Sequence, residues 1–366
     1  MPIIIEKEED VKAAVYGGAF LGGGGGGSIE EGLNLALKAL EIDKIRIYDV
    51  NELSDDTIVI TVSAVGAPAA KESYLKPEHL VRAVELINSF GVNVGALMPA
   101  ENGGFNTVNG WYQSVKLKIP LLNAACDGRA HPTGLMGAIG LHRVKDYISI
   151  QAAAGGNPEK NQYVEVIVRG SLTKAASMIR RASVEAGGVV GVARNPVKLS
   201  YVRKNAAIKA ITFAIDVGRK LLRGIENDDI YGGCEDIVKM LNGEIVDKVK
   251  ITSRVLETKE GFDIGYLNLS GQKGDYSITF VNEYLALEKN GSRIATFPDL
   301  ISLVDLSSGK PISSAEADIG IEALLVVIPR TSIPLGAGLF YHEVYEPIEK
   351  AVGKPIVDFI KDILKG

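Results

Sequence analysis

The run TIVITVSAVG at residues 57–66 decides the fold class of this chain. It is rich in β-branched residues and has the length of a strand, and the segment from Pro77 to Phe90 that follows it has the pattern of a helix. A second apolar run of strand length, VNVGALMP at 92–99, comes directly after that helix. Strands separated by helices at this spacing are typical of parallel sheets that are covered on both faces. We therefore predict an α/β fold.

The same alternation extends along the chain in both directions from this unit. Further strand-like runs are KIRIYDV (44–50), IPLLNAA (119–125), YISIQAAA (147–154) and QYVEVIVRG (162–170). Helical patterns cover residues 8–20, 28–41, 104–117, 134–142, 171–186 and 204–223. Ser28 and Glu31 have the S-x-x-E spacing of a capping box, which predicts that a helix begins after Ser28. The whole pattern predicts a mostly parallel, three-layer sheet domain.

The periodicity changes near residue 230. Between residues 243 and 330, short alternating runs of strand length are separated by turn signals such as GQKGD, KNG and SSGKP. Regular short strands of this kind predict a smaller antiparallel β-barrel-like domain. We therefore place the α/β domain at residues 1–235 and the β-barrel-like domain at residues 236–333. We expect residues 334–366 to rejoin the first domain and to end in a helix over 354–366.

The composition is that of an ordinary globular chain. Of its 366 residues 46% are hydrophobic and 23% are charged, and the formal net charge is −5. This balance does not indicate a positively charged surface for binding nucleic acid or an anionic membrane. The N-terminus has no signal-peptide pattern, and no segment reaches 18 uninterrupted apolar residues, so we expect a cytoplasmic protein with a small-molecule substrate. The sequence leaves open whether the chain forms a homo-oligomer.

Six consecutive glycines, Gly22–Gly27, stand immediately before the predicted helix at 28–41. Backbone amides at such a position can bind phosphate or carboxylate groups, so Gly24, Gly25 and Gly26 are candidate substrate-binding residues. The alternative is that the tract only makes a tight connection between two packed helices. A helix-like segment precedes the glycines where a dinucleotide-binding motif needs a strand, and no lysine stands in the P-loop position. We therefore expect no organic cofactor.

Polar loops follow three of the predicted strands, at residues 63–72, 98–113 and 123–137. In open α/β sheets, ligands bind in the crevice outside the carboxyl ends of the strands, where such loops meet. In the second loop, Glu101 is a candidate catalytic acid or base, and Asn102 and Asn106 are candidates for orienting a substrate. The alternative is that Glu101 and Asn106 cap the helix that begins near residue 104.

The third loop holds Cys126, Asp127, Arg129 and His131. Asp127 and His131 are candidate catalytic residues, although His131 is alternatively only a loop residue before Pro132. Arg129 is a candidate for binding a substrate carboxylate, because its planar fork matches that group. Cys126 is either a nucleophile or a buried packing residue. None of the four histidines has metal-ligand spacing, and we expect no protein-built metal site.

These loops resemble segments of the S-methyl-thiohydantoin desulfurase family. The matching segments are GAFLGGGGGG at 18–27, Gly66-Ala67-Pro68 with Glu72, Glu101 with Gly103, Gly104 and Asn106, Gly128-Arg129-Ala130 with Pro132, Asn282-Glu283, and Pro298-Asp299-Leu300-Ile301. The resemblance covers most of the chain and implies an α/β domain joined to a β-barrel-like domain. Typical members carry acidic residues at the positions of Asn123, Ala125 and Thr133, and an aromatic residue at the position of His131.

From the loops and the resemblance together, we predict a hydrolase-type enzyme that acts on a small polar cyclic amide or a thiohydantoin-like compound. Water would attack an imide-like carbon, with Glu101 or Asp127 as the base. Amides of the glycine tract would stabilise the developing negative charge, and Arg129 would hold a substrate carboxylate. The three departures from acidic residues leave open a second hypothesis, a non-catalytic small-molecule-binding protein on the same scaffold.

Overall fold

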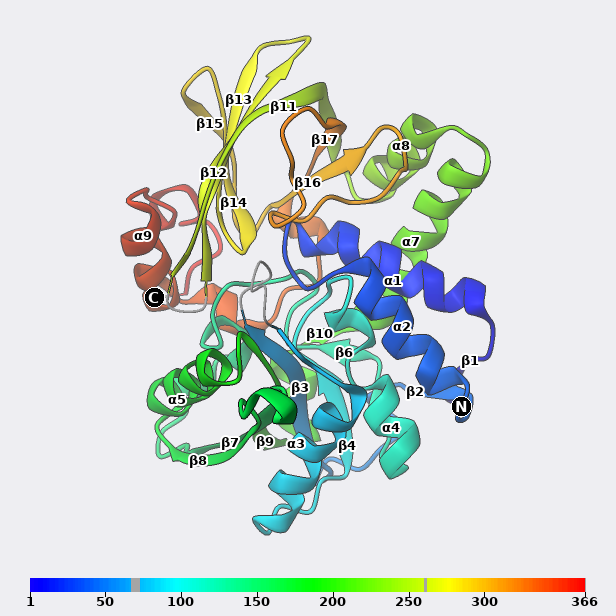
Figure 1. Ribbon diagram of the computed structural model, residues 1–366, viewed down its shortest axis with the longest axis vertical. Helices are drawn as coiled ribbons and strands as arrows, with labels where there is room; N and C mark the ends of the chain where they lie inside the picture. Colours follow the sequence, from blue (N-terminus) through cyan, green and yellow to red (C-terminus); the bar gives the residue numbers. More distant parts are fainter. Residues whose placement is uncertain (67–72, 260–261, 366) are drawn as a thin grey trace.

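The computed structural model describes residues 1–66, 73–259 and 262–365, and it contains two large sheets (Figure 1). Ala67, Pro68 and Glu72, which belong to the motifs of the resemblance, lie outside the described residues. The first sheet has eight strands in the order β1 (Ile3–Ile5), β2 (Ile45–Tyr48), β5 (Leu121–Leu122), β4 (Ala96–Pro99), β3 (Ile58–Gly66), β9 (Val189–Lys198), β7 (Ser149–Gly155) and β8 (Val164–Gly170). A short pair of strands, β6 (Ala124–Ala125) and β10 (Ala207–Ile208), lies beside it.

Both faces of the first sheet are covered, as the predicted three-layer arrangement requires. Alternate residues of a strand point to opposite faces, so Ile60 and Val62 join a core with one set of helices while Val59 joins a core on the other face. The helices on the first face are α1 (Glu8–Gly22), α2 (Ile29–Leu40), α3 (Pro77–Ser89) and α4 (Trp111–Leu117). Those on the second face are α5 (Leu172–Glu185) and α6 (Leu199–Asn205).

The first sheet is mixed, so the prediction of a mostly parallel sheet is only partly confirmed. The pairs β2–β5, β5–β4 and β4–β3 are parallel, whereas β1–β2, β3–β9, β9–β7 and β7–β8 are antiparallel. The sequence pattern did not predict β9, because Asn195 and Pro196 within it are residues typical of turns. In the structure Asn195 has a positive φ of 57°, and the register with β3 shifts there as in a β-bulge.

The second sheet is entirely antiparallel. Its order is β15 (Ser292–Thr296), β14 (Glu283–Lys289), β13 (Asp275–Val281), β12 (Phe262–Gly271), β11 (Glu244–Lys259), β17 (Glu322–Ile328) and β16 (Leu300–Asp305). Strand β14 also contacts β16, so the sheet curls into a half-barrel around an apolar interior. The predicted β-barrel-like fold of this region is thus confirmed as a half-barrel, while the division of the chain at residues 235 and 236 stays a prediction.

Helix α1 and two later helices pack together against β16 and β17 of the half-barrel. Phe20 and Leu21 of α1 lie in one core with Leu300 and Val304 of β16, and the same core includes α7 (Ala210–Glu226) and α8 (Ile230–Met240). Other residues of α1, such as Val15, belong to the core of the first sheet. Helix α1 therefore lies between the two sheets and contributes to both cores (Figure 1). No helix among the described residues is long and apolar enough to cross a membrane.

Four predicted helices differ in the structure. The helix expected over 134–142 is two 3-10 turns, Met136–Ala138 and Leu141–Arg143, because Ile139 and Gly140 between them have φ values of 44° and 80°. The helix expected over 204–223 begins only at Ala210, since α6 ends at Asn205 and β10 follows it. The helix expected over 104–117 is split into a 3-10 turn at Asn106–Val108 and α4, because Gly110 between them has a φ of 104°. The helix expected over 354–366 is wrong, since its described part holds only a 3-10 turn at Val357–Phe359. The segment before it forms α9 (Glu346–Val352), and this C-terminal region packs on Met136 of the first half and on β13 and β14 of the second.

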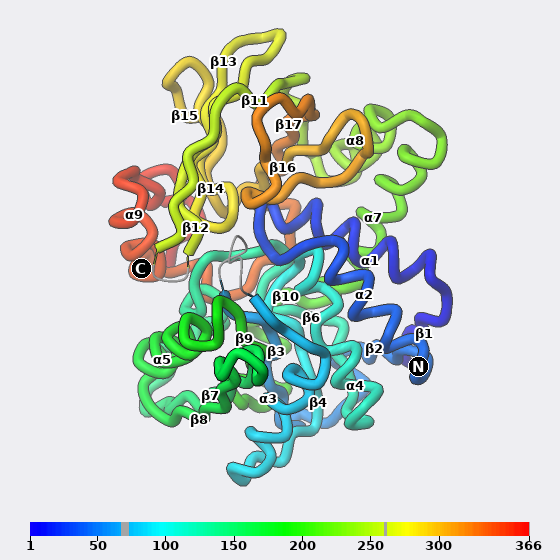
Figure 2. The backbone as a smooth tube through the Cα atoms, viewed as in Figure 1, coloured from blue at the N-terminus to red at the C-terminus, as the bar shows by residue number. Residues whose placement is uncertain are grey.

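The glycine tract runs from the end of α1 past β14 to the start of α2, as the blue tube in Figure 2 shows. The carbonyl of Gly23 accepts a hydrogen bond from the backbone N–H of Tyr284 at 2.7 Å. The carbonyl of Gly26 accepts two, from Phe105 and Asn106 at 3.0 Å each. The predicted cap is also present, since the Ser28 side chain accepts a hydrogen bond from the N–H of Glu31. The tract therefore links both sheets through its backbone.

We expect Gly26→Ala to destabilise the protein far more than Gly91→Ala. Both glycines have positive φ, 79° and 89°, so both substitutions carry a backbone strain of about 1 kcal/mol. A Cβ at residue 26 would also collide with the backbone of Gly103, whereas a Cβ at residue 91 would meet open space. The expected loss in unfolding free energy is about 2–5 kcal/mol for Gly26→Ala and about 1 kcal/mol for Gly91→Ala. Chemical denaturation measures both, and equal losses would contradict the close packing of the tract.

Candidate functional site

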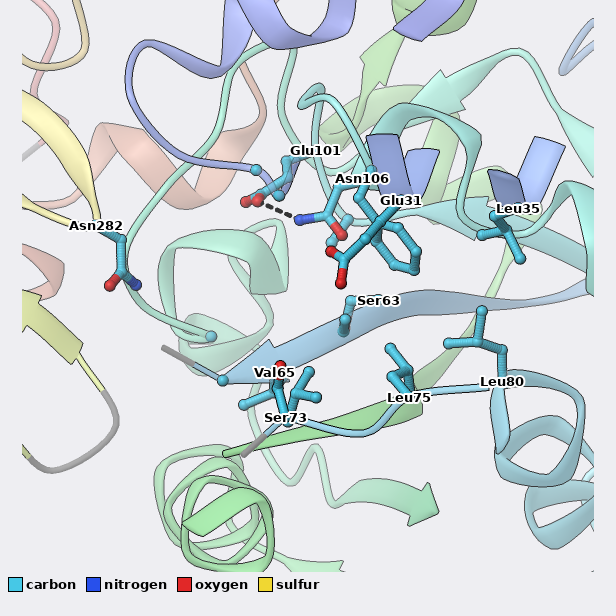
Figure 3. A pocket seen from close by; sticks show the side chains of 18 of the residues that line it. Glu31, Leu35, Ser63, Val65, Ser73, Leu75, Leu80, Glu101, Asn106 and Asn282 are labelled. Carbon is cyan, nitrogen blue, oxygen red and sulfur yellow. Dashed lines mark hydrogen bonds between the residues drawn. The ribbon is translucent and has the colours of Figure 1, made fainter. Parts of the chain in front are cut away.

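A cavity of about 350 Å³ lies at the carboxyl edge of β3 and β4 (Figure 3). Its wall combines residues from the glycine tract, α2, the ends of β3 and β4, the loop after β6, α5, β9 and the start of β14. One side is apolar, with Leu35, Leu75 and Leu80, and the other side carries Glu101, Asn106 and His131. Both halves of the chain therefore contribute to one concave site.

Glu101, Asp127 and His131 form a buried cluster at this site. Nδ1 of His131 lies 2.9 Å from Oε2 of Glu101 and 3.3 Å from Oδ2 of Asp127. Glu101 follows β4 and Asp127 follows β6. An isolated parallel β-bridge between these two residues holds the two loops side by side. The backbone N–H of His131 also donates to Oε2 of Glu101 at 3.1 Å. Three residues that the sequence analysis proposed as catalytic thus lie in direct contact.

Burial and mutual charge set the protonation of this cluster. Burial disfavours the charged imidazole, but the adjacent carboxylates outweigh it and raise the pKa of His131. Burial would raise the pKa of Glu101, but the charge of His131 and the hydrogen bonds to it prevail and lower that pKa. Burial raises the pKa of Asp127 to about 7. These shifts favour an ionised Glu101 beside a protonated His131.

The two asparagines of the second loop have different surroundings. Asn106 lines the cavity and donates from Nδ2 to Oε1 of Glu101 at 2.6 Å, which leaves its Oδ1 without a hydrogen-bond partner among the described residues. Asn102 is fully buried and donates to the carbonyls of Gly128 and Ala210. Asn106 is thus positioned to contact a ligand, whereas the hydrogen bonds of Asn102 join two loops and α7.

Of the three candidate glycines, only Gly26 lies in the cavity wall. Gly26 lines the cavity together with Gly27, whereas Gly24 and Gly25 lie behind them against Tyr284 and Glu283. A side chain at residue 24 or 25 would collide with one of these two residues. The amides of Gly26 and Gly27 make no hydrogen bond to any described residue.

Arg129 is fully buried but does not line the cavity. Its guanidinium donates to the backbone carbonyls of Ala130, Pro298, Asp299 and Tyr284, and it stacks 4.5 Å from the ring centre of Phe297. These contacts tie the loop after β6 to the second sheet. The role of Arg129 as a carboxylate anchor stays a prediction, and its bonding favours a structural role.

Two other arginines, which the sequence analysis did not single out, do line the cavity. Arg194 projects from β9 next to the bulge at Asn195, and its buried Nε has no hydrogen-bond partner among the described residues. Arg180 of α5 donates to the carbonyl of Gly66 and lies over the ring of Phe262. Burial lowers the pKa of Arg180 to about 10, so it stays charged at neutral pH.

Two further buried polar atoms of the cavity wall have no hydrogen-bond partner among the described residues: Oγ of Ser63 and Oε2 of Glu283. Buried polar groups are almost always paired in proteins, so such atoms in a cavity are candidate ligand contacts. Glu283 was quoted in the sequence only as part of a motif, and Ser63 only as part of a strand and of the polar loop at residues 63–72.

Cys126 is fully buried beside Thr61, outside the cavity wall. Burial raises the pKa of its thiol to about 12, which opposes formation of a thiolate. This environment favours the packing interpretation of Cys126. Within the described ranges, no group of three or more His, Cys, Asp or Glu side chains is arranged to hold a metal ion.

Comparison with known proteins identifies the family. Residues 9–164 match the N-terminal domain of the S-Me-THD-like family and residues 170–333 match its C-terminal domain, so the chain belongs to this family. The fold is similar to that of a crystal structure of a protein from Chromobacterium violaceum, with a TM-score of 0.71 and 19% sequence identity over 95% of this chain and 96% of that chain. At this identity the likeness shows the fold alone. A search of curated proteins finds no match.

We expect His131→Gln to destabilise the protein more near pH 6 than near pH 9. The raised pKa of His131 means that its ion pair stabilises the fold below about pH 6.5 and that this contribution is lost as the pH rises through the raised value. The lowered pKa of Glu101 keeps its side of the pair intact down to about pH 4.5. Loss of the buried pair near pH 6 should cost about 3–5 kcal/mol.

Thermal and chemical unfolding at the two pH values measure this difference. The exposed His342→Gln is the matched control and should change the unfolding free energy little. A loss for His131→Gln that is the same at both pH values would contradict the ion pair.

Proposed function

We propose that this member of the S-Me-THD-like family is a hydrolase acting on a small polar cyclic amide or thiohydantoin-like compound. One observation carries the proposal: a buried Glu101–His131–Asp127 cluster opens on a cavity of about 350 Å³. Cavities of about 300–1,000 Å³ are typical of small-molecule sites. The family name, S-Me-THD-like, supports a ring compound of the hydantoin type.

In this proposal Glu101 is the base that activates water. It is ionised at neutral pH, and its Oε1 keeps a lone pair beyond the bond from Asn106, whereas Oε2 faces both the backbone N–H and Nδ1 of His131. Those two contacts fix the direction of the carboxylate, which is what a general base needs for an aligned proton transfer. The ion pair with His131 stabilises the ionised form of Glu101 before the transfer.

Attack by water on an imide-like carbon places negative charge on the atom that was doubly bonded to it. The amides of Gly26 and Gly27 make no hydrogen bond to any described residue and lie at the cavity wall, so they would stabilise this charge by hydrogen bonding. Such fixed donors are more effective than water because they need no reorientation during the reaction. The glycine tract would thus act through its backbone.

Arg194 is the better candidate for holding an anionic group of the substrate. It lies in the cavity wall, and its Nε has no hydrogen-bond partner among the described residues, whereas the donors of Arg129 are bonded to backbone carbonyls. Ser63 and Oδ1 of Asn106 add a hydroxyl and an acceptor suited to the N–H groups of a cyclic amide.

A non-catalytic binding protein is the second candidate. Asn123, where typical members carry an acid, bonds Thr212 at the start of α7, so no carboxylate enters the site from that position. Ala125 is buried in β6, and Thr133 lines the cavity without a charge.

We expect Glu101→Gln to lower turnover by about 10²–10⁴-fold while the fold is retained. The amide keeps the shape of the side chain but has no basicity. The measurement is steady-state kinetics on hydantoins, S-methyl-thiohydantoins and lactams, with the melting temperature as a folding check. Glu185→Gln, an exposed glutamate of α5, is the matched control and should be unchanged.

Two results would contradict this assignment. Full activity of Glu101→Gln together with an inactive Cys126→Ser would favour a covalent mechanism. Tight binding of one compound without turnover of any would favour the binding protein.

Lysine substitutions should separate the two arginines. Arg194→Lys is expected to raise KM for carboxylate-bearing substrates by about tenfold or more, because an ammonium lacks the planar fork. It should change KM little for the neutral analogues. Arg129→Lys is expected instead to lower the melting temperature with KM nearly unchanged, because it removes several bonds to buried carbonyls. The opposite pattern would assign the anchor to Arg129.

A further inference from the structure

Glu283 is a buried acid that faces the cluster from the other half of the chain. It begins β14, lines the cavity, and only 3% of its surface is exposed. Its Oε2 has no hydrogen-bond partner among the described residues. Asn282 beside it also lines the cavity, on the opposite side from Asn106 in Figure 3. The carboxyl group is thus desolvated yet adjacent to the space a substrate would fill.

The carboxyl group of Glu283 packs directly against the backbone of Gly25. A Cβ at residue 25 would collide with Oε1, so the glycine at that position is required for the acid to lie where it does. The glycine tract therefore contributes to the site in two ways. Gly26 and Gly27 supply amides, and Gly25 makes space for Glu283.

The charged groups around Glu283 come from three elements: Glu101 after β4, Arg129 in the loop after β6, and Arg180 of α5. Burial is the largest influence, and with the repulsion of Glu101 it raises the pKa of Glu283 well above its ordinary value, against the attraction of the two arginines. The donors of Arg129 are directed to backbone carbonyls and make no hydrogen bond to this carboxyl. Glu283 therefore retains its proton at a pH where Glu101 has lost its own.

We propose that Glu283 is the general acid of the hydrolysis and protonates the leaving group while Glu101 deprotonates water. This role rests on the proposed function. Two carboxyl groups that share one cavity in opposite protonation states are the arrangement that acid–base catalysis requires.

The step balances without an oxidant or a second reactant. Water forms a C–O bond to the ring carbon and gives its proton to Glu101, as the electron pair of the C=N bond moves to the ring nitrogen. The tetrahedral intermediate then collapses: the electron pair on the ring nitrogen re-forms the C=N bond as the C–S bond breaks, and the departing sulfur takes the proton of Glu283. The resulting C(OH)=N group tautomerises to the carbonyl and N–H of the hydantoin ring. Glu101 loses a proton and Glu283 regains one through solvent, which completes the cycle.

The test compares two substrates with the same ring and different leaving groups, an S-methyl-thiohydantoin and its S-(4-nitrophenyl) analogue. Methanethiolate is a poor leaving group and needs protonation, whereas nitrothiophenolate departs without it. We expect Glu283→Gln to lower kcat by about 10²–10⁴-fold on the first and by less than about tenfold on the second. Glu322→Gln, an exposed glutamate of the same sheet, is the matched control and should be unchanged on both.

A second measurement does not depend on turnover. The infrared difference spectrum between the wild-type protein and the Glu283→Gln variant at neutral pH should contain the C=O band of a protonated carboxylic acid. Absence of that band, or an equal kcat loss on both substrates, would overturn the acid role while leaving the base role of Glu101 in place. If the wild-type protein turned over neither substrate, the proposed function would be overturned, and the acid role with it.

Discussion

The structure depends on the close approach of the glycine tract to both halves of the chain. Its carbonyls bond the N–H groups of Tyr284 on one side and of Phe105 and Asn106 on the other. A side chain at residue 24, 25 or 26 would collide with β14 or with the loop after β4. Because only glycine allows this approach, the tract fixes the distance between Glu283 and the Glu101 cluster. The rest of the site is built on that distance.

Arg129 supports the same junction, and its guanidinium lies close to Gly23 of the tract. A buried guanidinium is costly unless its donors are bonded, and here they are bonded to the carbonyls of Asp299, Pro298 and Tyr284 in the second half. Asp127 strengthens the arrangement, since its Oδ1 accepts the N–H of Gly336 in the C-terminal region. Polar groups of the first half thus hold the second half in place through its backbone, and the fold and the site share these contacts.

The sequence predicted the layers of the fold and the composition of one cluster, because those properties are local. Alternating strands and helices, the cap at Ser28, and the loops holding Glu101 and His131 can each be read from a short window. It did not predict Arg194, since the turn-like residues Asn195 and Pro196 concealed strand β9 and the bulge beside which Arg194 lies. Nor did it predict the direction of Arg129, because a side chain's direction depends on contacts more than 150 residues away along the chain.

The cavity explains why so many charged groups are tolerated in one buried region. Glu101, Asp127 and Glu283 would repel one another if all were ionised, and among the described residues only His131 lies within ion-pair distance of the first two. The repulsion is relieved by protonation, so the cluster holds protons at neutral pH instead of expelling a carboxylate to solvent. Neither half of the chain contains this set alone, since Glu101, Asp127 and His131 belong to the first and Glu283 to the second. Unequal proton affinity among these acids is therefore a consequence of how the two halves pack.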